Sequence, residues 1–410
     1  MSVVQRSGNC MKKLVSVASP RGYLAIDSTI NGKAWGGIRF QKEISETEIL
    51  RMAHAMTLKF GFSGIPQGGA KAVIIGDPDA PHSDRLNELI RFGRKIRPFL
   101  HEGSFNPAGD MGTSNADIEY MLRSLNVEKQ LSNYRSSLSG FYTAVSVAAG
   151  AASAMQHSGK SLRDASVVID GFGSVGSNLA MILTNLGAKV IGIGNSSGAV
   201  YQPGGIRLYR FVRFLKGYGP AAIQAYPDGV PLTTDQLISL PADIVCPCSI
   251  HYRIRSRNAD TIQARIVCAG SNLPVTSQAE SHLMDKGVLC LPHFITNCGG
   301  VLGGTMEFAS IPVRKIQSII YTKIKSATSQ LLLMSEELRV PCAEIAEAVA
   351  QNSFKVMKRR AGSPGLKEHL MRLIVNTHHM RLLPQALVGA IAPIYFKGAI
   401  AKISPDNFYS

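Results

Sequence analysis

The stretch Val167-Val-Ile-Asp-Gly171-Phe-Gly173-Ser-Val-Gly176 decides the fold of the second half of this chain. It starts as a short apolar strand and then turns through glycines with the spacing G-x-G-x-x-G. Where such a turn joins a strand to a helix, backbone N–H groups and the helix dipole can receive a pyrophosphate. The motif alone is weak evidence, but its place between a strand and a helix favours dinucleotide binding over a structural turn.

The residues after this turn continue in a βαβ pattern. A helix is expected over residues 178–186, ending at Gly187, and a strand over residues 190–193. Three later apolar runs, over residues 243–246, 266–269 and 288–291, predict further strands of the same sheet. We therefore expect an α/β domain with a Rossmann-like, doubly wound parallel sheet.

The residue type about twenty positions after the glycine turn bears on the cofactor. In this position an acidic residue normally holds the adenosine ribose of NAD. This chain has Asn195-Ser196 instead. An asparagine can hydrogen-bond a ribose hydroxyl and does not repel a 2′-phosphate, so both NAD and NADP stay open. The cofactor residues expected from this half are Gly171, Gly173, Ser174, Val175, Gly176, Asn195 and Ser196.

Upstream, two glycine-containing turns each carry one ionisable residue. Lys71 follows Gly68-Gly-Ala at the mouth of an apolar strand, and Asp110 follows Pro107-Ala-Gly. A partly desolvated lysine near another cation has a lowered pKa and can activate water near neutral pH. Lys71 could instead be a surface lysine, and Asp110 a turn residue. Together, however, they form the acid/base pair that oxidative deamination needs.

The N-terminal part predicts two strands and a helix before Lys71. Strands are expected over residues 23–27 and 36–40, paired through a turn at Asn31-Gly32. Ser45 and Glu48 form a capping-box signal, and the helix after them carries an apolar face. Lys59 lies on the flank of that face. Because a charged side chain directed inward needs a partner or a ligand, Lys59 is a candidate for binding a substrate carboxylate. A second helix is expected after the cap formed by Ser114 and Asp117.

These blocks resemble the Glu/Leu/Phe/Val amino acid dehydrogenase family from about Tyr23 to Glu307. The resemblance implies that Lys59 binds the α-carboxylate, that Lys71 activates water and that Asp110 moves the amine proton. It also implies that Ser139, Asn272 and Asn297 lie near the nicotinamide and the substrate backbone. The motifs that carry it are Gly36-Gly-Ile-Arg39, Lys59, Gly68-Gly-Ala-Lys71, Ala108-Gly-Asp110, Gly171-Phe-Gly-Ser-Val-Gly176, Gly270-Ser-Asn272-Leu-Pro274 and Asn297-Cys-Gly-Gly-Val301.

Departures from the family pattern bear on the substrate. Glutamate-specific members have a lysine before the paired glycines and a serine after the Asn-x-Gly-Gly segment, and both grip the side-chain carboxylate. This sequence has Trp35 before Gly36-Gly37, and Gly304 at the serine position. Since an unpaired buried carboxylate is costly, an apolar or aromatic amino acid fits better. The resemblance is therefore closer to the leucine/phenylalanine branch. Cys248 replaces a small residue of the family's Pro-Ala-Ala segment near the cofactor.

The length of 410 residues suits two domains around a cleft. We expect a substrate and catalytic domain over residues 1–138 and the Rossmann domain over residues 139–310. A helical C-terminal region, residues 311–410, is expected to pack back on the first domain. The implied reaction is the reversible oxidative deamination of an L-amino acid to a 2-oxo acid and ammonia.

Composition limits the partners. The net charge of +16 is unusual for a metabolic enzyme, but the basic clusters are scattered and match no nucleic-acid motif. We expect a homo-oligomer in the cytoplasm, with no membrane or nucleic-acid partner. Cys246-Pro-Cys248 lacks a second Cys/His pair, so no metal site is expected.

Three alternative functions remain open at this point. The first is a glutamate dehydrogenase, and the second is an aminating or condensing dehydrogenase of a specialised pathway. The third is an inactive family member that binds nucleic acid through its basic surface, which salt-sensitive DNA binding without turnover would favour. The presence of Lys59, Lys71 and Asp110 argues against the third.

Overall fold

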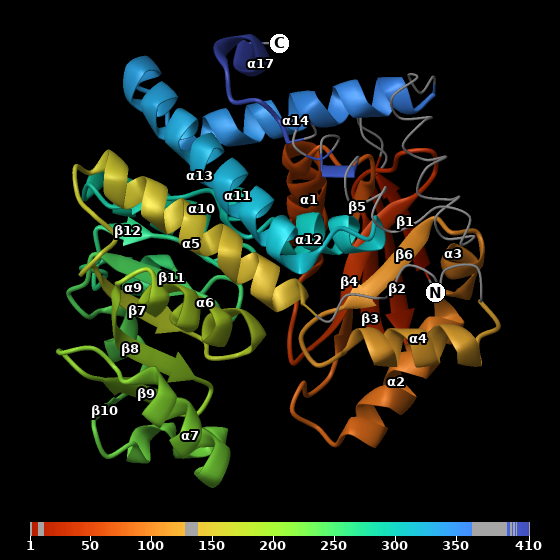
Figure 1. The fold of residues 1–410 in the computed structure, drawn as a ribbon. Coiled ribbons are helices and arrows are strands. Elements are labelled where there is room, and N and C mark those ends of the chain that lie inside the picture. Colours follow the sequence, from red (N-terminus) through yellow and green to blue (C-terminus); the bar gives the residue numbers. More distant parts are fainter. Residues whose placement is uncertain are drawn as a thin grey trace. The chain divides into compact units, whose positions relative to one another are not determined.

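The computed structural model of the chain describes residues 2–6, 12–127, 138–362, 392–393, 396, 398 and 400–409. The contacts among these residues divide the chain into two α/β units (Figure 1). The first unit takes described residues within Met1–Ser137, Gly304–Ile311 and Val349–Ala401. The second takes those within Leu138–Gly303, Pro312–Ala348 and Lys402–Ser410.

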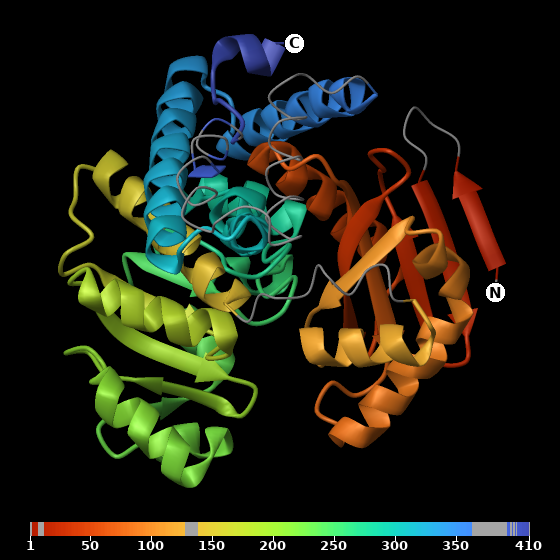
Figure 2. The ribbon, with the colours of Figure 1, turned by 45° about the vertical axis from the view of Figure 1, so that its right-hand side comes forward.

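A six-stranded mixed sheet forms the first unit, in the order β1-β2-β3-β5-β4-β6. Figure 2 shows β1, at the N-terminus, on the outer edge of this sheet. β4 is parallel to β5 and β6, whereas β3 is antiparallel to β5. The strands are β1 Ser2–Arg6, β2 Lys12–Ala18, β3 Arg21–Ile26, β4 Ala34–Gln41, β5 Gly68–Ile75 and β6 Phe105–Gly109.

The expected pairing of the strand at 23–27 with the strand at 36–40 is wrong. β5 lies between them, and Ala72 is the partner of both Leu24 on β3 and Ile38 on β4. β5 is buried along nearly its whole length. A strand that is buried on both faces gains most from a central place, which explains why it separates the two strands next to each other in sequence.

The two faces of this sheet carry different residues because side chains alternate along each strand. Ile38 and Ala72 point into a hydrophobic core with α2, α3 and α4. A Cβ atom on Gly69 would meet the backbone of α1 at 2.6 Å, so the odd-numbered positions of β5 face α1. By the same alternation Lys71 and Arg39 lie on the α1 face. The helices are α1 Glu46–Ser63, α2 His82–Lys95, α3 Arg97–His101 and α4 Asn115–Ser124.

Both predicted caps in this unit are confirmed. Ser45 and Glu48 form a reciprocal capping box at the start of α1, and Ser114 and Asp117 form one at the start of α4. α1 ends at Gly64, whose φ of 66° is in the left-handed region that glycine tolerates. These local signals fix where the two helices begin, and α4 begins directly after the turn that carries Asp110.

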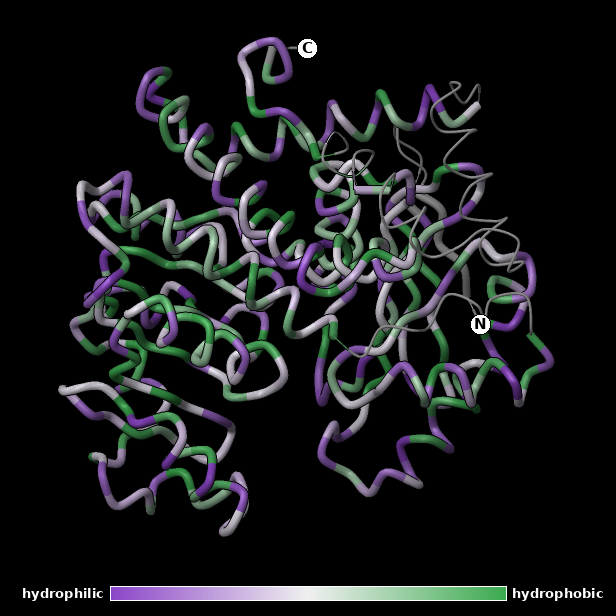
Figure 3. The backbone as a smooth tube through the Cα atoms, in the orientation of Figure 1, coloured by the Kyte–Doolittle hydropathy of each residue, from purple (hydrophilic) through white to green (hydrophobic). Residues whose placement is uncertain are grey.

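A seven-stranded sheet forms the second unit, in the order β10-β9-β8-β7-β11-β12-β13. The neighbouring strands β8, β7, β11, β12 and β13 are parallel, as the βαβ pattern predicted. Next to β8, strands β9 and β10 add an antiparallel edge. Figure 3 shows that hydrophobic residues follow the strands. The strands are β7 Ser166–Asp170, β8 Lys189–Asn195, β9 Gly198–Tyr201, β10 Val230–Leu232, β11 Ile244–Pro247, β12 Ile266–Val267 and β13 Leu289–Cys290.

The helix after the glycine turn starts earlier than the sequence suggested. α6 spans Ser174–Asn185, so it begins inside the turn rather than at residue 178. The other helices are α5 Ser139–His157, α7 Leu208–Tyr218, the 3₁₀ helix η2 Pro220–Ala225, α8 Thr234–Ile238, α9 Ser256–Ala259, α10 Ser277–Asp285, α11 His293–Thr296, α12 Gly299–Phe308, α13 Val313–Leu338, α14 Cys342–Ala361 and α17 Pro405–Tyr409.

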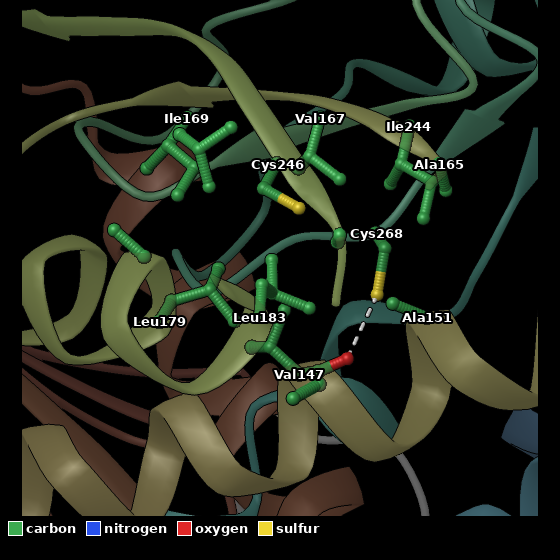
Figure 4. Packing of buried hydrophobic residues seen from close by; sticks show 14 of the residues in the cluster. Val147, Ala151, Ala165, Val167, Ile169, Leu179, Leu183, Ile244, Cys246 and Cys268 are labelled. Carbon is green, nitrogen blue, oxygen red and sulfur yellow. Dashed lines mark hydrogen bonds between the residues drawn. The ribbon is translucent and has the colours of Figure 1, made fainter. Parts of the chain in front are cut away.

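One hydrophobic core of the second unit lies between its sheet, α5 and α6 (Figure 4). Val147 and Ala151 on α5 meet Leu179 and Leu183 on α6, beneath the apolar strands. The Cys268 thiol donates to the Val147 carbonyl at 3.4 Å. Small residues on α5 let the backbones of neighbouring helices approach, which explains why the most apolar run of the sequence is a packed helix.

The C-terminal region does not form one body. α13 packs on α5, and described residues as far as Ala348 belong to the second unit. Those from Val349 to Ala401 belong to the first unit, and those from Lys402 onward belong to the second. The region expected to return to the first domain as a whole, residues 311–410, is therefore divided, because buried Ile320 and Ile324 place α13 in the second unit's core. Its stretch 363–391 lies outside the described residues.

Six cysteines are described, and all are free thiols in the second unit. Five are buried and Cys248 is half-buried. Burial raises the pKa of the thiols of Cys246, Cys248, Cys268, Cys290 and Cys342. In the part of the chain that is described, no helix is long and apolar enough to cross a membrane.

Candidate functional site

Lys71, Asp110 and Arg39 form a buried charged cluster in the first unit. Lys71 lies on β5, Arg39 on the neighbouring β4, and Asp110 directly after β6. Lys71 Nζ donates to Asp110 Oδ2, and Arg39 donates to both oxygens, from Nε at 3.1 Å and from Nη2 at 3.0 Å. The side chains of Arg39 and Lys71 are only 9% and 4% exposed. Lys71 and Asp110, which were both singled out from the sequence, are therefore in contact, and Arg39 is a second cation beside them.

The backbone around Asp110 makes this contact possible. A Cβ atom on Gly37 would lie 2.9 Å from Asp110 Cβ and 3.0 Å from Oδ2, so only glycine leaves room for the carboxylate. Thr113 Oγ1 accepts from the Asp110 N–H at 2.9 Å and donates to the Ile38 carbonyl at 2.6 Å. The Met111 N–H donates to Asp110 Oδ1 at 2.8 Å. The turn is therefore tied to β4, and the carboxylate is held on the same face as Lys71.

Burial and neighbouring charges set the protonation of the pair. Burial lowers the pKa of Lys71 below its ordinary value, and Arg39 lowers it further, while Asp110 opposes them. Burial alone would raise the pKa of Asp110, but Arg39 and Lys71 together hold it well below its ordinary value. Asp110 is therefore a carboxylate, and Lys71 is a lysine prepared to release its proton more easily than a solvated one.

The other expected substrate residues of the first unit are spread over its elements. Lys59 lies on α1, the helix that packs on the α1 face of the sheet, and is 6% exposed. Trp35 and Gly37 lie on β4, the strand that carries Arg39. Gly304 belongs to α12. Lys59 is thus buried as its place on the apolar face of the helix implied.

The glycine turn of the second unit has the shape of a phosphate cradle. Gly171 has a φ of 110°, and a Cβ atom there would meet the Ser249 N–H nitrogen at 2.6 Å. Gly173 caps α6, and a Cβ atom on it would have open space around it. A Cβ atom on Gly176 would strike the carbonyl of Gly171. The turn is closed on the protein side and open beyond Gly173, which fits a pyrophosphate at the N-terminus of α6.

Residues expected near the nicotinamide surround the same turn. A Cβ atom on Gly140, next to Ser139, would meet Ser174 Cβ at 2.9 Å. A Cβ atom on Gly270 would meet Val175 Cγ1 at 2.8 Å and Cys248 Sγ at 2.9 Å. The segments that contain Ser139, Cys248 and Gly270 therefore pack on the start of α6. The geometry brings these widely separated parts of the sequence together.

Asn297 and Asn272 are joined by their side chains. Asn297 Nδ2 donates to Asn272 Oδ1 at 3.1 Å and to the Ser271 carbonyl at 2.8 Å. Asn297 Oδ1 is buried and accepts no hydrogen bond from any residue that the structure describes. Because buried polar atoms are nearly always paired, this oxygen fits a donor that a bound ligand would bring. The orphaned oxygen and the glycine cradle together fit a dinucleotide cofactor in this unit.

Asn195 ends β8 but does not present a free side chain. Its Nδ2 donates to the Pro220 carbonyl at 2.7 Å, and its Oδ1 accepts from the Ser197 N–H at 2.8 Å. Ser196, next to it, is exposed. From Gly171 to Pro227 the chain has no acidic residue. This segment therefore offers a ribose hydroxyls and amides, and contributes no carboxylate of its own.

A second buried charged cluster escaped the sequence analysis. Asp170, the last residue of β7, accepts from Ser249 Oγ and from Arg253 Nε, the latter at 3.2 Å. Arg253 also donates to Asp235 Oδ1 at 2.8 Å and to the Thr234 carbonyl. The cluster ties the end of β7, where the glycine turn starts, to the loop after β11 and to α8. The feature of the sequence that could have indicated this cluster is Asp170, an aspartate at the end of an apolar strand.

Models of one protein family match nearly all of the described chain. The model of glutamate/leucine/phenylalanine/valine dehydrogenase matches residues 137–362, and that of the Glu/Leu/Phe/Val dehydrogenase dimerisation domain matches residues 2–127. The chain belongs to this family. It is an amino acid dehydrogenase that acts on a CH–NH₂ donor with NAD or NADP.

Named relatives place the chain near glutamate dehydrogenases. Glutamate dehydrogenase of Thermotoga maritima is 30% identical over 331 residues, which cover 76% of this chain and 77% of that protein. The catabolic NAD-specific glutamate dehydrogenase of Bacillus subtilis is 31% identical over 304 residues, 70% of each chain. Among solved structures, the hetero-hexameric glutamate dehydrogenase of Thermus thermophilus matches with a TM-score of 0.72 at 19% identity, over 89% of this chain and 90% of that chain. These similarities support the family and the fold, and they do not support the leucine/phenylalanine branch.

Proposed function

We propose that this dehydrogenase catalyses the reversible oxidative deamination of an apolar or aromatic L-amino acid. The observation that carries the proposal is the buried Lys71–Asp110 pair, in which Lys71 has a lowered pKa. The products are the 2-oxo acid, ammonia and the reduced nicotinamide cofactor. An acid/base pair of this kind suits a reaction in which water must add to an imine and an amine must leave.

Each residue of the first unit has a defined task in this proposal. Lys59, a buried cation, pairs with the α-carboxylate of the amino acid. When bound, a nicotinamide would supply the acceptor for the hydride of the α-carbon, and loss of that hydride from the neutral amine would give a protonated imine. Neutral Lys71 takes a proton from the water that attacks the imine carbon, and that proton passes through Asp110 to the departing amine. The hydroxyl proton of the intermediate is released as the 2-oxo acid forms, and Lys71 is neutral again. Asp110 suits this proton transfer because it accepts a hydrogen bond from Lys71.

Residues of the second unit hold the cofactor in this proposal. The turn from Gly171 to Gly176, with Ser174 and Val175, receives the pyrophosphate, and Asn297 Oδ1 accepts a hydrogen bond from the bound ligand. Ser139, Cys248 and Asn272 line the same region, because their segments pack on α6 or on Asn297. Asn195 and Ser196 lie where the adenosine ribose would bind.

The substrate preference rests on missing partners for a γ-carboxylate. Trp35 and Gly304 occupy the positions at which glutamate-specific members have a lysine and a serine. Arg39 is the nearest other candidate on β4, but its Nε and Nη2 are both bonded to Asp110. A γ-carboxylate buried without a counter-charge would lose hydration without compensation. Leucine, valine, phenylalanine or tryptophan would gain from burial instead.

The test compares kcat/KM for glutamate with the values for those four amino acids, using NAD⁺ and NADP⁺ in turn. We expect the best apolar or aromatic substrate to exceed glutamate by about tenfold or more, since burying an uncompensated carboxylate costs several kcal/mol. A Trp35→Lys/Gly304→Ser double variant should shift the ratio toward glutamate. Glutamate winning by about tenfold in the wild type would instead support the function of the named relatives.

We infer that the lack of a carboxylate near the ribose position leaves room for a 2′-phosphate, so NADP is accepted. Asn195→Asp should shift the NAD/NADP ratio of kcat/KM toward NAD, because a carboxylate repels the phosphate. The affinities for AMP and 2′,5′-ADP, measured by calorimetry, report the same preference without turnover. A ratio that stays the same in both measurements would show that Asn195 is not near the ribose.

We infer that the protein works as a homo-oligomer, because the family model matched over residues 2–127 is that of a dimerisation domain. Size-exclusion chromatography with light scattering measures the subunit number directly. A monomer at micromolar concentration would contradict this inference.

A further inference from the structure

Arg39 belongs to the buried cluster but has no task in the proposed chemistry. Its guanidinium spans the Asp110 carboxylate with two hydrogen bonds, Nε to Oδ2 at 3.1 Å and Nη2 to Oδ1 at 3.0 Å. The side chain is only 9% exposed and comes from β4, whereas Asp110 follows β6. A planar, two-point contact of this kind fixes direction as well as distance.

The other contacts of Asp110 leave its carboxylate one orientation. Oδ1 accepts from Arg39 and from the Met111 N–H, the latter at 2.8 Å, and Oδ2 accepts from Arg39 and Lys71. Because each oxygen already has two donors, rotating the carboxylate would break several bonds at once. Without Arg39, Oδ1 would keep only the Met111 N–H, and the contact with Lys71 would be the remaining restraint on Oδ2.

We propose that Arg39 is a positioning residue of this dehydrogenase: it fixes the rotation of the Asp110 carboxylate beside Lys71 and sets which of the two groups holds the proton. The proposal rests on the acid/base roles proposed above for Lys71 and Asp110. It assigns Arg39 no contact with the substrate or the cofactor.

The charges around Lys71 explain the second part of the proposal. Burial and Arg39 favour the neutral amine, while Asp110 favours the ammonium. Ala25 of β3 is the strand partner of Lys71, and the buried Asp27 just after β3 bonds to Thr57 and His54 of α1. α1 packs on this face and adds the buried Lys59, a further cation in the same unit. When Arg39 is removed, one of the two influences that lower the pKa of Lys71 is lost, while the raising effect of Asp110 stays. The pKa of Lys71 therefore rises.

Two variants at one position separate charge from geometry. Arg39→Met removes both, and Arg39→Lys keeps the charge but loses the two-point contact. For Arg39→Met we expect kcat to fall by about tenfold or more, with the acid limb of the kcat/KM profile moving to higher pH. Arg39→Lys should also lower kcat, but the acid limb of its kcat/KM profile should stay at the wild-type pH. Lys42→Met, a matched loss of charge at a side chain that is 71% exposed, should change neither.

Measurements without turnover keep the test independent of the proposed function. A short pulse of acetic anhydride at each pH, followed by peptide mass spectrometry, reports the midpoint at which Lys71 becomes reactive. Thermal unfolding shows which variants are folded, and Arg39→Gln replaces Arg39→Met if the latter is not. We expect the midpoint to rise in the uncharged variant and to stay in Arg39→Lys.

The outcomes that overturn the proposal are specific. One is an Arg39→Met enzyme with kcat within about twofold of the wild type and an unmoved acid limb. Another is an unmoved acetylation midpoint in the uncharged variant, whether or not the wild type turns over an amino acid. A third is an equal shift in Arg39→Met and Arg39→Lys. A wild type that oxidises no amino acid counts against the proposed function alone.

Discussion

The two units each bury an aspartate–arginine ion pair at the end of a strand, with opposite charge balance. In the first unit one carboxylate, Asp110, pairs with two cations, Arg39 and Lys71. In the second unit one cation, Arg253, pairs with two carboxylates, Asp170 and Asp235. Both clusters connect segments far apart in sequence, but only the first contains a cation whose pKa is lowered by its surroundings.

The difference indicates which cluster is available for chemistry. Arg253 keeps its proton at any working pH, because burial is outweighed by its carboxylate partners, which raise its pKa. Its contacts join the glycine turn to neighbouring loops and need no change during a reaction. Lys71 has a lowered pKa despite its carboxylate partner. If Lys71 releases its proton, Asp110 still has Arg39 as a partner. In the second cluster, both carboxylates depend on the single cation Arg253.

The largest expected effect comes from removing Lys71, the cation of the first cluster that has a lowered pKa. Lys71→Ala should reduce kcat by about 10²–10⁴-fold, since it removes the base that activates water. Cofactor binding, followed by the fluorescence of the bound reduced cofactor, should survive, because Lys71 is in the other unit from the glycine turn. A variant that keeps more than about a tenth of the wild-type kcat would show that Lys71 is not the base.

Asp110→Asn should cost about 10²-fold in kcat and also change how stability depends on pH. The pKa of Asp110 is lower in the folded chain than in the unfolded chain. Its contribution to the free energy of unfolding is therefore present above the unfolded value, about pH 3.9, and is lost as the pH falls through the lower folded value. The stability difference between wild type and variant, from urea unfolding, should shrink in acid. A difference that does not depend on pH would contradict the ion pair.

Breaking the second cluster should affect stability more than chemistry. Arg253→Met leaves Asp170 as a buried carboxylate with only Ser249 beside it, which should cost about 3 kcal/mol. Asp235→Asn is the matched control, because the Asp235 side chain is 70% exposed and its pair should contribute at most about 1 kcal/mol. Urea midpoints of the two variants give the comparison. Equal losses would mean that the two clusters do not differ as described.

The smallest expected change moves the Asp110 carboxylate without removing it. In Gly37→Ala the new methyl group would lie 2.9 Å from Asp110 Cβ and must displace it. We expect kcat to fall by about tenfold, with little change in melting temperature. Gly217→Ala is the control, since its Cβ atom would meet nothing within 4 Å and alanine favours the helix. Wild-type kcat in Gly37→Ala would show that the position of Asp110 is not critical.

Local features of this fold could be predicted from sequence, and long-range pairings could not. The glycine turn and the capping boxes at Ser45 and Ser114 depend on residues a few positions apart, so their patterns are visible in one segment. The order β3-β5-β4 depends on which strand gains most from a central place, and adjacency in sequence gave the wrong partner.

The candidate site divides in the same way. Lys71 and Asp110 could be chosen because each lies in a glycine-containing turn. The role of Arg39 is invisible in sequence, because its partner Asp110 is 71 positions away and meets it only after β4 and β6 pair. The contact between Arg253 and Asp170 spans 83 positions and depends equally on strand order.

The placement of the described cysteines has a practical consequence. All six lie in the second unit, and burial makes the thiolate hard to form at five of them. Thiol reagents react with the thiolate, so these positions should stay unlabelled until the second unit opens. Peptide mapping after a timed pulse of iodoacetamide would therefore report opening of the second unit and give no signal from the described part of the first unit. The described cysteines are therefore a site-resolved probe of the opening of the second unit alone.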